Sequence, residues 1–142
     1  MSRQRSRSRS LAIQALYQWQ MAGQDVGSII NHFMLEQDAK KFDAEYFSEL
    51  VRAVPTRLTE LDQALEPCID RALDSIDPVE RAILRMGAYE LIEHPEIPYR
   101  VVINEAVELA KTFGAEKGHR YVNGVLDKAA RALRPVETSA RR

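Results

Sequence analysis

The first ten residues of the chain carry four arginines, at alternate positions from 3 to 9, and no acid. A guanidinium group can contact two oxygens of one phosphate, so such a row is suited to the backbone of a nucleic acid. If the helix predicted from Leu11 onwards extends back into this stretch, Arg5 and Arg9 lie on one face and Arg7 lies about one turn aside. The stretch is then either a solvated basic tail or a fixed row of phosphate ligands.

A second group of cations lies near the other end of the chain and includes aromatic residues. Lys117, Tyr121 and Lys128 share one face of the last long predicted helix. Arg120 is adjacent, and Phe113 precedes a helix-ending glycine. Unstacked bases of single-stranded RNA can lie on aromatic rings while the phosphates meet cations. The alternative is that each ring belongs to the core.

The net charge of -1 conceals an uneven distribution along the chain. Residues 111–142 hold eight basic and three acidic side chains, whereas residues 11–110 hold eight basic and eighteen acidic ones. Basic ends suit a polyanion, and an acidic middle suits a basic partner. Solvated basic tails would give the same counts.

Patterns for catalysis or metal binding are scarce. The three histidines are far apart in sequence, and no pair of candidate ligands has the spacing of a common metal motif. Cys68 lies on an apolar helical face and is expected in the core. Glu105 and Glu108 are expected on the wet face of a helix, and no glycine-rich phosphate loop is present. We therefore expect no enzyme, no metal and no cofactor.

The first predicted helix has two apolar stripes. Leu16 and Trp19 lie on the stripe expected to face the core, while Ile13, Tyr17 and Met21 follow one another at four-residue spacing on another face. The second stripe is either offered to a partner or buried like the first.

Apolar residues at helical spacing run through most of the chain and predict an all-α protein of about seven helices. Asp25, Asp43 and Asp77 are expected to cap three of these helices, and Pro78 fits the first turn behind the last cap. Pro55 should kink or restart a helix. Pro67 is expected to begin a short helix over 68–73.

The length of 142 residues fits one domain. We expect a flexible basic segment over residues 1–10, with the first helix starting anywhere from Ser6 to Ser10. A single helical domain over 11–135 and a disordered end over 136–142 should follow. The single cysteine, and the lack of a long apolar run or a signal peptide, favour the cytoplasm.

Several segments together resemble the NusB family of bacterial transcription antitermination factors. These are ALYQWQ (15–20), VERAILR (79–85) with AYEL (88–91), INEAVELAKTFG (103–114) and YVNGVLDK (121–128). The resemblance spans nearly the whole chain in the expected order. It implies two packed three-helix bundles, no catalysis, and a role in RNA polymerase antitermination complexes on ribosomal RNA operons. Family members bind the boxA element of nascent RNA together with NusE, a small-subunit ribosomal protein.

The resemblance also assigns residues to two surfaces. The RNA surface of the family carries over onto Arg5, Arg7, Arg9, Phe113, Lys117 and Tyr121, beside which Arg120 lies. The NusE-facing surface carries over onto Tyr17, Met21 and Glu80. Two departures limit the transfer: serines 6, 8 and 10 interrupt the basic run, and Lys117 stands where relatives can carry an acid. That lysine should favour RNA binding.

Two other readings compete with this one. A similar domain forms the N-terminal part of some RNA cytosine methyltransferases, but the chain has neither a glycine-rich cofactor loop nor a catalytic cysteine motif. The chain could instead be a protein-interaction module or a homodimer whose basic ends only aid solubility. Self-association could occlude the arginine row.

Overall fold

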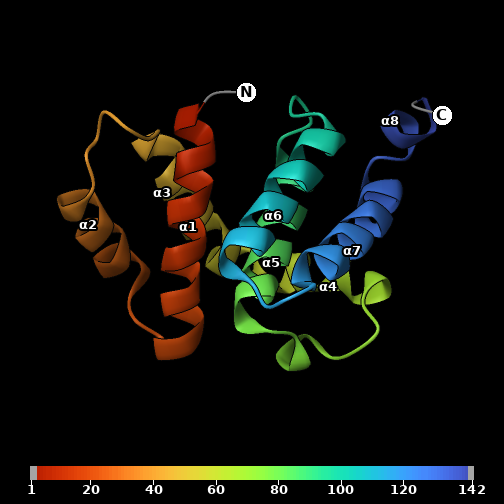
Figure 1. The fold of residues 1–142 in the computed structure, drawn as a ribbon, viewed down its shortest axis with the longest axis horizontal. Helices are drawn as coiled ribbons and strands as arrows, with labels where there is room; N and C mark the ends of the chain where they lie inside the picture. The colour runs from red at the N-terminus through yellow and green to blue at the C-terminus, as the bar shows by residue number, and fades with distance from the viewer. Residues whose placement is uncertain (1–2, 141–142) are drawn as a thin grey trace. The chain divides into compact units, whose positions relative to one another are not determined.

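The computed structural model describes residues 3–140, and every regular element in that range is helical (Figure 1). In chain order the elements are α1 (Arg3–Ala22), α2 (Val26–Glu36), α3 (Ala44–Thr56), α4 (Leu58–Leu65), the 3-10 turns η1 (Glu66–Cys68) and η2 (Leu73–Ser75), α5 (Pro78–Glu93), α6 (Tyr99–Phe113), α7 (Gly118–Leu133) and α8 (Pro135–Ala140). The predicted all-α fold is confirmed. No helix among the described residues is long and apolar enough to cross a membrane.

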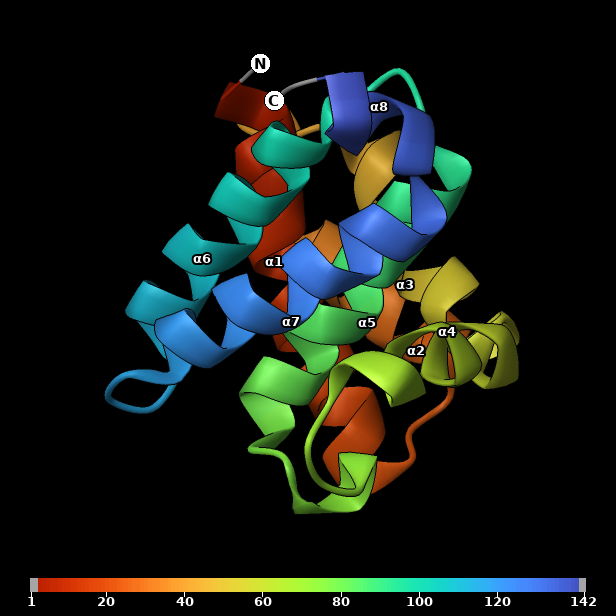
Figure 2. The same cartoon turned by 90° about the vertical axis from the view of Figure 1, so that its right-hand side faces the viewer.

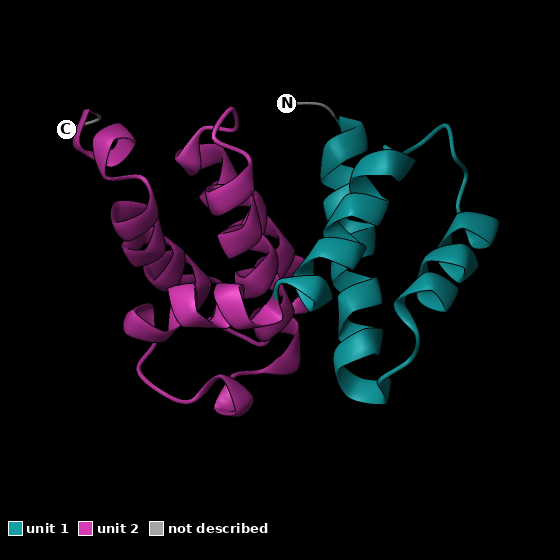
Figure 3. Ribbon diagram, turned by 180° about the vertical axis from the view of Figure 1, so that it is seen from behind, with its two compact units in different colours: residues 1–57 teal, residues 58–142 magenta. Residues whose placement is uncertain are grey.

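The chain divides into two compact units, Met1–Arg57 and Leu58–Arg142 (Figure 3). In the first unit, α1, α2 and α3 pack against one another as a three-helix bundle. In the second, α5, α6 and α7 form the central bundle, with α4 packed on α5 and α8 on α7 (Figure 2). The region expected as one domain over 11–135 is thus built from two units.

The start of α1 is part of the first unit. Ser8 is buried, and its hydroxyl donates to the Asp43 carbonyl at 2.7 Å and accepts from the Asp43 amide at 2.9 Å. Because this contact ties the second turn of α1 to the beginning of α3, the helix begins at Arg3, and the expected start between Ser6 and Ser10 is wrong. Residues 1–2 of the expected flexible segment lie outside the described range.

The predicted helix caps are confirmed. The carboxylates of Asp25 and Asp43 each accept a hydrogen bond of 3.0 Å from a backbone amide in the first turn of their helix. Asp77 accepts two such bonds, of 3.1 and 3.2 Å, with Pro78 as the first residue of α5. These bonds satisfy amide groups that a helix start otherwise leaves without partners. Pro55 lies near the end of α3, and α4 starts after Arg57.

The short helix expected over 68–73 is wrong. The chain leaves η1 in an extended conformation at Ile69 and returns to a single 3-10 turn at Leu73. A side chain ties the extended part of this segment to α7, since Asp70 accepts a hydrogen bond of 3.2 Å from the hydroxyl of Tyr121.

The C-terminal end is organised around one buried arginine. Arg134 donates to four backbone carbonyls between residues 90 and 97 and, at 3.0 Å, to the carboxylate of Glu137. Glu137 also accepts from the Tyr99 amide at 2.9 Å, at the start of α6. These bonds explain why residues 135–140 form α8, where a disordered end was expected. Residues 141–142 of that expected end lie outside the described range.

Candidate nucleic-acid interface

The arginines of α1 are fixed largely by partners inside their own unit. The guanidinium carbon of Arg5 lies 4.1 Å from the centre of the Tyr46 ring, and its Nε lies 3.8 Å from the Asp43 carboxylate. Arg7 is exposed and donates to the Gln37 side chain at 3.2 Å. Arg9 is 0 % exposed, with its guanidinium carbon 5.4 Å from the same Tyr46 ring. These three arginines are therefore held in place, but the buried Arg9 cannot reach a phosphate in this conformation.

A second cationic group surrounds the turn that joins α6 to α7. We call Phe113, Lys117, Arg120 and Tyr121 the junction cluster. Phe113 is 37 % exposed, so the alternative that placed it in the core is wrong. Lys117 and Arg120 are exposed and make no ion pair within residues 3–140. Lys117 has a backbone φ of 66°, a left-handed conformation that is uncommon for any residue but glycine.

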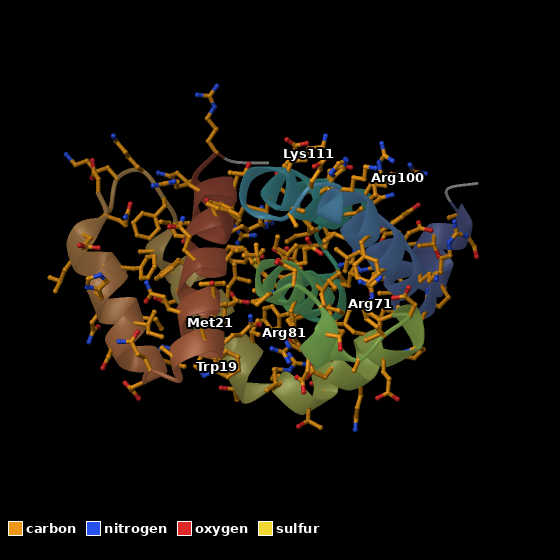
Figure 4. All side chains as sticks on the ribbon, turned by 60° about the horizontal axis from the view of Figure 1, so that its bottom comes forward. Trp19, Met21, Arg71, Arg81, Arg100 and Lys111 are labelled. Atoms are coloured by element: carbon orange, nitrogen blue, oxygen red, sulfur yellow. The ribbon has the colours of Figure 1, made fainter. Side chains whose placement is uncertain are left out.

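The ring of Tyr121 is half-buried and is held from the segment after η1. Its hydroxyl donates to Asp70, and the guanidinium carbon of Arg71 lies 4.5 Å from its centre. Arg71 in turn donates to Asp70 at 2.8 Å, and this hydrogen bond lowers the pKa of the Asp70 carboxyl. Burial, followed by the bond to Asp70, raises the pKa of Tyr121, so the phenol is neutral at physiological pH. Figure 4 shows Arg71 among the side chains of the second unit.

Asp70 and Arg71 carry no pattern in the sequence that marks them as part of this site. Both fall in the segment that was expected to be a short helix, where adjacent opposite charges indicate only a solvated surface. Their relation to Tyr121 depends on a contact between residues 51 positions apart, and spacing along the chain carries no signal for it.

Glu80 lies beneath the turn between α6 and α7. It is 7 % exposed, and the backbone amide of Ala115 lies close to its carboxylate. A Cβ atom placed on Gly118 would lie 2.6 Å from the carboxyl carbon of Glu80, so any larger residue there would force the Glu80 carboxylate to shift. Burial and the neighbouring Asp77 raise the pKa of Glu80, while the Ala115 amide and Arg71 oppose that rise. Glu80 therefore packs against the turn that carries the junction cluster.

The second stripe of α1 is only partly exposed. Tyr17 and Met21 are 39 % and 56 % exposed, whereas Ile13 is buried with the core stripe. Trp19 is half-buried, and both it and Met21 lie near the C-terminal end of α1 (Figure 4). The candidate partner surface on this helix is thus confined to its last two turns.

The described residues give little indication of a metal site or a reactive cysteine. Within residues 3–140 there is no group of three histidine, cysteine or acidic side chains that could hold a metal ion. Cys68 is buried, as expected, and burial raises the pKa of its thiol. Exposed cations around aromatic rings on a helical scaffold are instead typical of a protein that binds nucleic acid.

The comparisons with known proteins agree with this class. The profile of the NusB family matches residues 6–131. The chain is 57 % identical to the transcription antitermination protein NusB of Nitrosococcus oceani over 99 % of this chain and 95 % of that protein. It is 51 % identical to the corresponding protein of Idiomarina loihiensis, over 93 % of this chain and 95 % of that one. The chain therefore belongs to the NusB family, whose members are transcription antitermination factors and not enzymes.

Solved structures of the family have the same fold. The structure of T. maritima NusB is 28 % identical with a TM-score of 0.80, covering 92 % of this chain and 93 % of that one. A crystal structure of the antitermination factors NusB and NusE in complex with dsRNA is 30 % identical with a TM-score of 0.82, covering 93 % of this chain and 99 % of that one.

Proposed function

We propose that this protein binds the boxA element of nascent ribosomal RNA as a single strand, together with NusE, within an RNA polymerase antitermination complex. The observation that carries the proposal is the junction cluster, in which two exposed cations and two partly exposed aromatic rings lie at the turn between α6 and α7. Membership of the NusB family and the similarity to NusB crystallised with NusE and RNA support it. Because transcription is the process involved, we place the protein in the cytoplasm.

The RNA contacts fall into two kinds. Lys117, Arg120 and Arg7 are exposed cations that would meet phosphates, and the rings of Phe113 and Tyr121 would stack with bases. Arg5, with its guanidinium group over the Tyr46 ring, would present its remaining donors to the strand. Arg9 would contribute to binding by holding the start of α1 in place.

The NusE contact would use the exposed end of α1. Tyr17 and Met21 offer apolar surface in a protein whose middle is acidic, which suits a basic partner such as a ribosomal protein. Glu80, which is 7 % exposed, would not meet NusE directly and would act on this contact through the α6–α7 turn that it lies against. A homodimer that covered the arginine row would compete with RNA.

The experiment is a fluorescence anisotropy titration of labelled boxA RNA with and without NusE. We expect Tyr121→Asp and Arg7→Glu to weaken RNA binding, and Tyr17→Asp to weaken the gain in RNA affinity that NusE gives. Arg52→Glu and Leu35→Asp are matched controls, because they alter an exposed arginine and an exposed apolar residue elsewhere in the first unit. If NusE adds nothing to the affinity, or if all variants bind as the native protein does, the proposal is wrong.

The salt dependence of the same titration tests the competing interaction module. Each phosphate contact to a single strand should contribute about 0.7 to the slope of log affinity against log salt. Lys117→Glu should reduce that slope, whereas a protein with basic ends that only aid solubility would show a slope near zero.

A further inference from the structure

A cavity of about 230 Å³ lies beside Tyr121 in the second unit. Its lining comes from Cys68 and Asp70 on one side and from one face of α7, between Arg120 and Lys128, on the other. Pockets that bury whole drug-sized ligands span roughly 300–1,000 Å³, so this one suits a single planar heterocycle. Arg71, which covers the Tyr121 ring, is not part of this lining. The cavity therefore opens on a part of Tyr121 that Arg71 leaves uncovered.

The glycine at position 124 is unexplained by the packing of the protein itself. It lies inside α7, where glycine is a poor helix former, and it lines the cavity. A Cβ atom placed there would meet no atom within 4 Å. By contrast, Gly87 and Gly118 each face a side chain that a Cβ would strike. A helix-weakening residue without an internal steric reason indicates that something outside the fold approaches the backbone closely.

The cavity is lined by two cations that could meet phosphates and by a carboxylate that could accept hydrogen bonds from a base. Arg120 and Lys128 line it, are exposed, and make no ion pair within the described part of the chain. Asp70 supplies a carboxylate whose side chain is 70 % exposed. Its Oδ1 accepts from Arg71 and Tyr121, whereas its Oδ2 accepts one long hydrogen bond of 3.3 Å from Arg71 and retains capacity for a further donor.

We propose that this cavity receives one base of the bound RNA strand and selects guanine. The base would contact the Tyr121 ring, its Watson–Crick edge would face Asp70, and the flanking phosphates would meet Arg120 and Lys128. The proposal rests on the proposed RNA-binding function and adds a base-specific site to it.

The selection of guanine follows from the chemistry of the carboxylate. Asp70 is ionised at neutral pH because Arg71 lowers the pKa of its carboxyl, so it can only accept hydrogen bonds. The edge of guanine offers two neighbouring donors, N1–H and the N2 amino group. Cytosine and adenine offer one amino group beside an acceptor nitrogen, and uracil offers one imide N–H between two carbonyl groups. Guanine should therefore bind most tightly and uracil most weakly.

The first test fills the cavity. Gly124→Leu should raise the melting temperature by roughly 2–5 °C, since leucine is the better helix former, and should weaken binding of a boxA RNA strand about tenfold, since stacking on an aromatic residue is lost. Ala132→Leu is the matched control, because Ala132 is an exposed small residue of α7 outside the cavity lining. An unchanged affinity for Gly124→Leu would overturn the proposal.

The second test measures base preference directly, with NusE present throughout. The probes are a twelve-residue oligouridine strand and the same strand with one central guanosine. The native protein should bind the guanosine strand about tenfold more tightly, as expected for a hydrogen bond to a charged acceptor. In Asp70→Asn this ratio should fall to about one, although the affinity for oligouridine itself should not fall, because a negative charge has been removed.

Asp74→Asn is the control for the second test, because Asp74 is an exposed acid of the same loop region that does not line the cavity. It should keep the tenfold ratio. A ratio near one in the native protein, or a ratio that survives in Asp70→Asn, would overturn guanine selection. If the native protein binds neither strand nor boxA RNA, the proposed function itself fails. If it binds boxA RNA and Gly124→Leu binds equally well, only the cavity assignment fails.

Discussion

The arginine row of α1 and the junction cluster look alike in sequence but differ in how their cations are used. Both combine basic residues with helical spacing, and both were predicted to bind phosphate. In the row, Arg5 and Arg9 lie against Tyr46, and Arg9 is buried. In the junction cluster, Lys117 and Arg120 are exposed, and the contact to an aromatic ring is made by Arg71 from another segment. A basic residue near a chain end can thus contact RNA only if its own unit leaves it accessible.

The largest expected effect separates two arginines of the row. Arg9→Ala should reduce the free energy of unfolding by about 2–5 kcal/mol, because it removes a large buried side chain. Arg7→Ala should change it by about 0.5 kcal/mol or less, since Arg7 is exposed. Urea denaturation followed by circular dichroism measures both. Equal stability of the two variants, with an equal loss of RNA affinity, would make Arg9 a phosphate ligand like Arg7.

The next largest effect concerns Gly118 and Glu80, which lie at the turn that carries the junction cluster. Gly118→Ala should reduce the free energy of unfolding by about 1–3 kcal/mol, because the buried Glu80 carboxylate must shift to admit the new Cβ. RNA affinity should fall with it, since the turn that carries Lys117 must shift. A double-mutant cycle with Glu80→Ala should show a coupling of at least about 0.5 kcal/mol in unfolding experiments. Additive losses would mean that Glu80 does not set the conformation of the turn.

A smaller effect is expected at Lys117, where one substitution should raise the stability of the protein and lower its affinity for RNA. Lys117→Gly should stabilise the protein by up to about 1 kcal/mol, because glycine adopts the left-handed conformation without strain. The same variant should bind RNA several-fold more weakly, since one phosphate contact is lost. Lys117→Asn is the control, because asparagine tolerates this conformation and also lacks the charge. Weaker binding by Gly together with native affinity for Asn would assign the effect to the backbone rather than to the charge.

The smallest expected effect is a pH dependence of stability at Glu80. Because the pKa of Glu80 is raised in the folded protein, the folded state holds a proton more tightly than the unfolded one. The resulting stabilisation is complete below the ordinary pKa of 4.5 and is lost as the pH rises through the higher folded value. Urea denaturation across this range should show a fall in stability with rising pH that is smaller in Glu80→Gln. An identical pH profile in that variant would contradict the assignment.

Much of the fold could be predicted from local patterns. The caps at Asp25, Asp43 and Asp77 and the apolar periodicity of the helices act within a few residues, so the sequence reports them directly. The segment over 68–73 could not be predicted in this way, because its conformation depends on a contact with α7. The candidate site was predictable in its residue types, while the burial of Arg9 and Glu80 was not.

The sequence by itself determined that this chain is an all-helical member of the NusB family with basic residues and aromatic rings near both ends. Helix periodicity, capping and charge are local properties that composition and spacing reveal. Only the tertiary structure decided which cations are exposed. It buries Arg134 in hydrogen bonds to backbone carbonyls and so removes it from the basic surface. It also brings Asp70 and Gly124 together at a cavity beside Tyr121. Burial and contact arise between residues far apart in the chain, so no local pattern contains them.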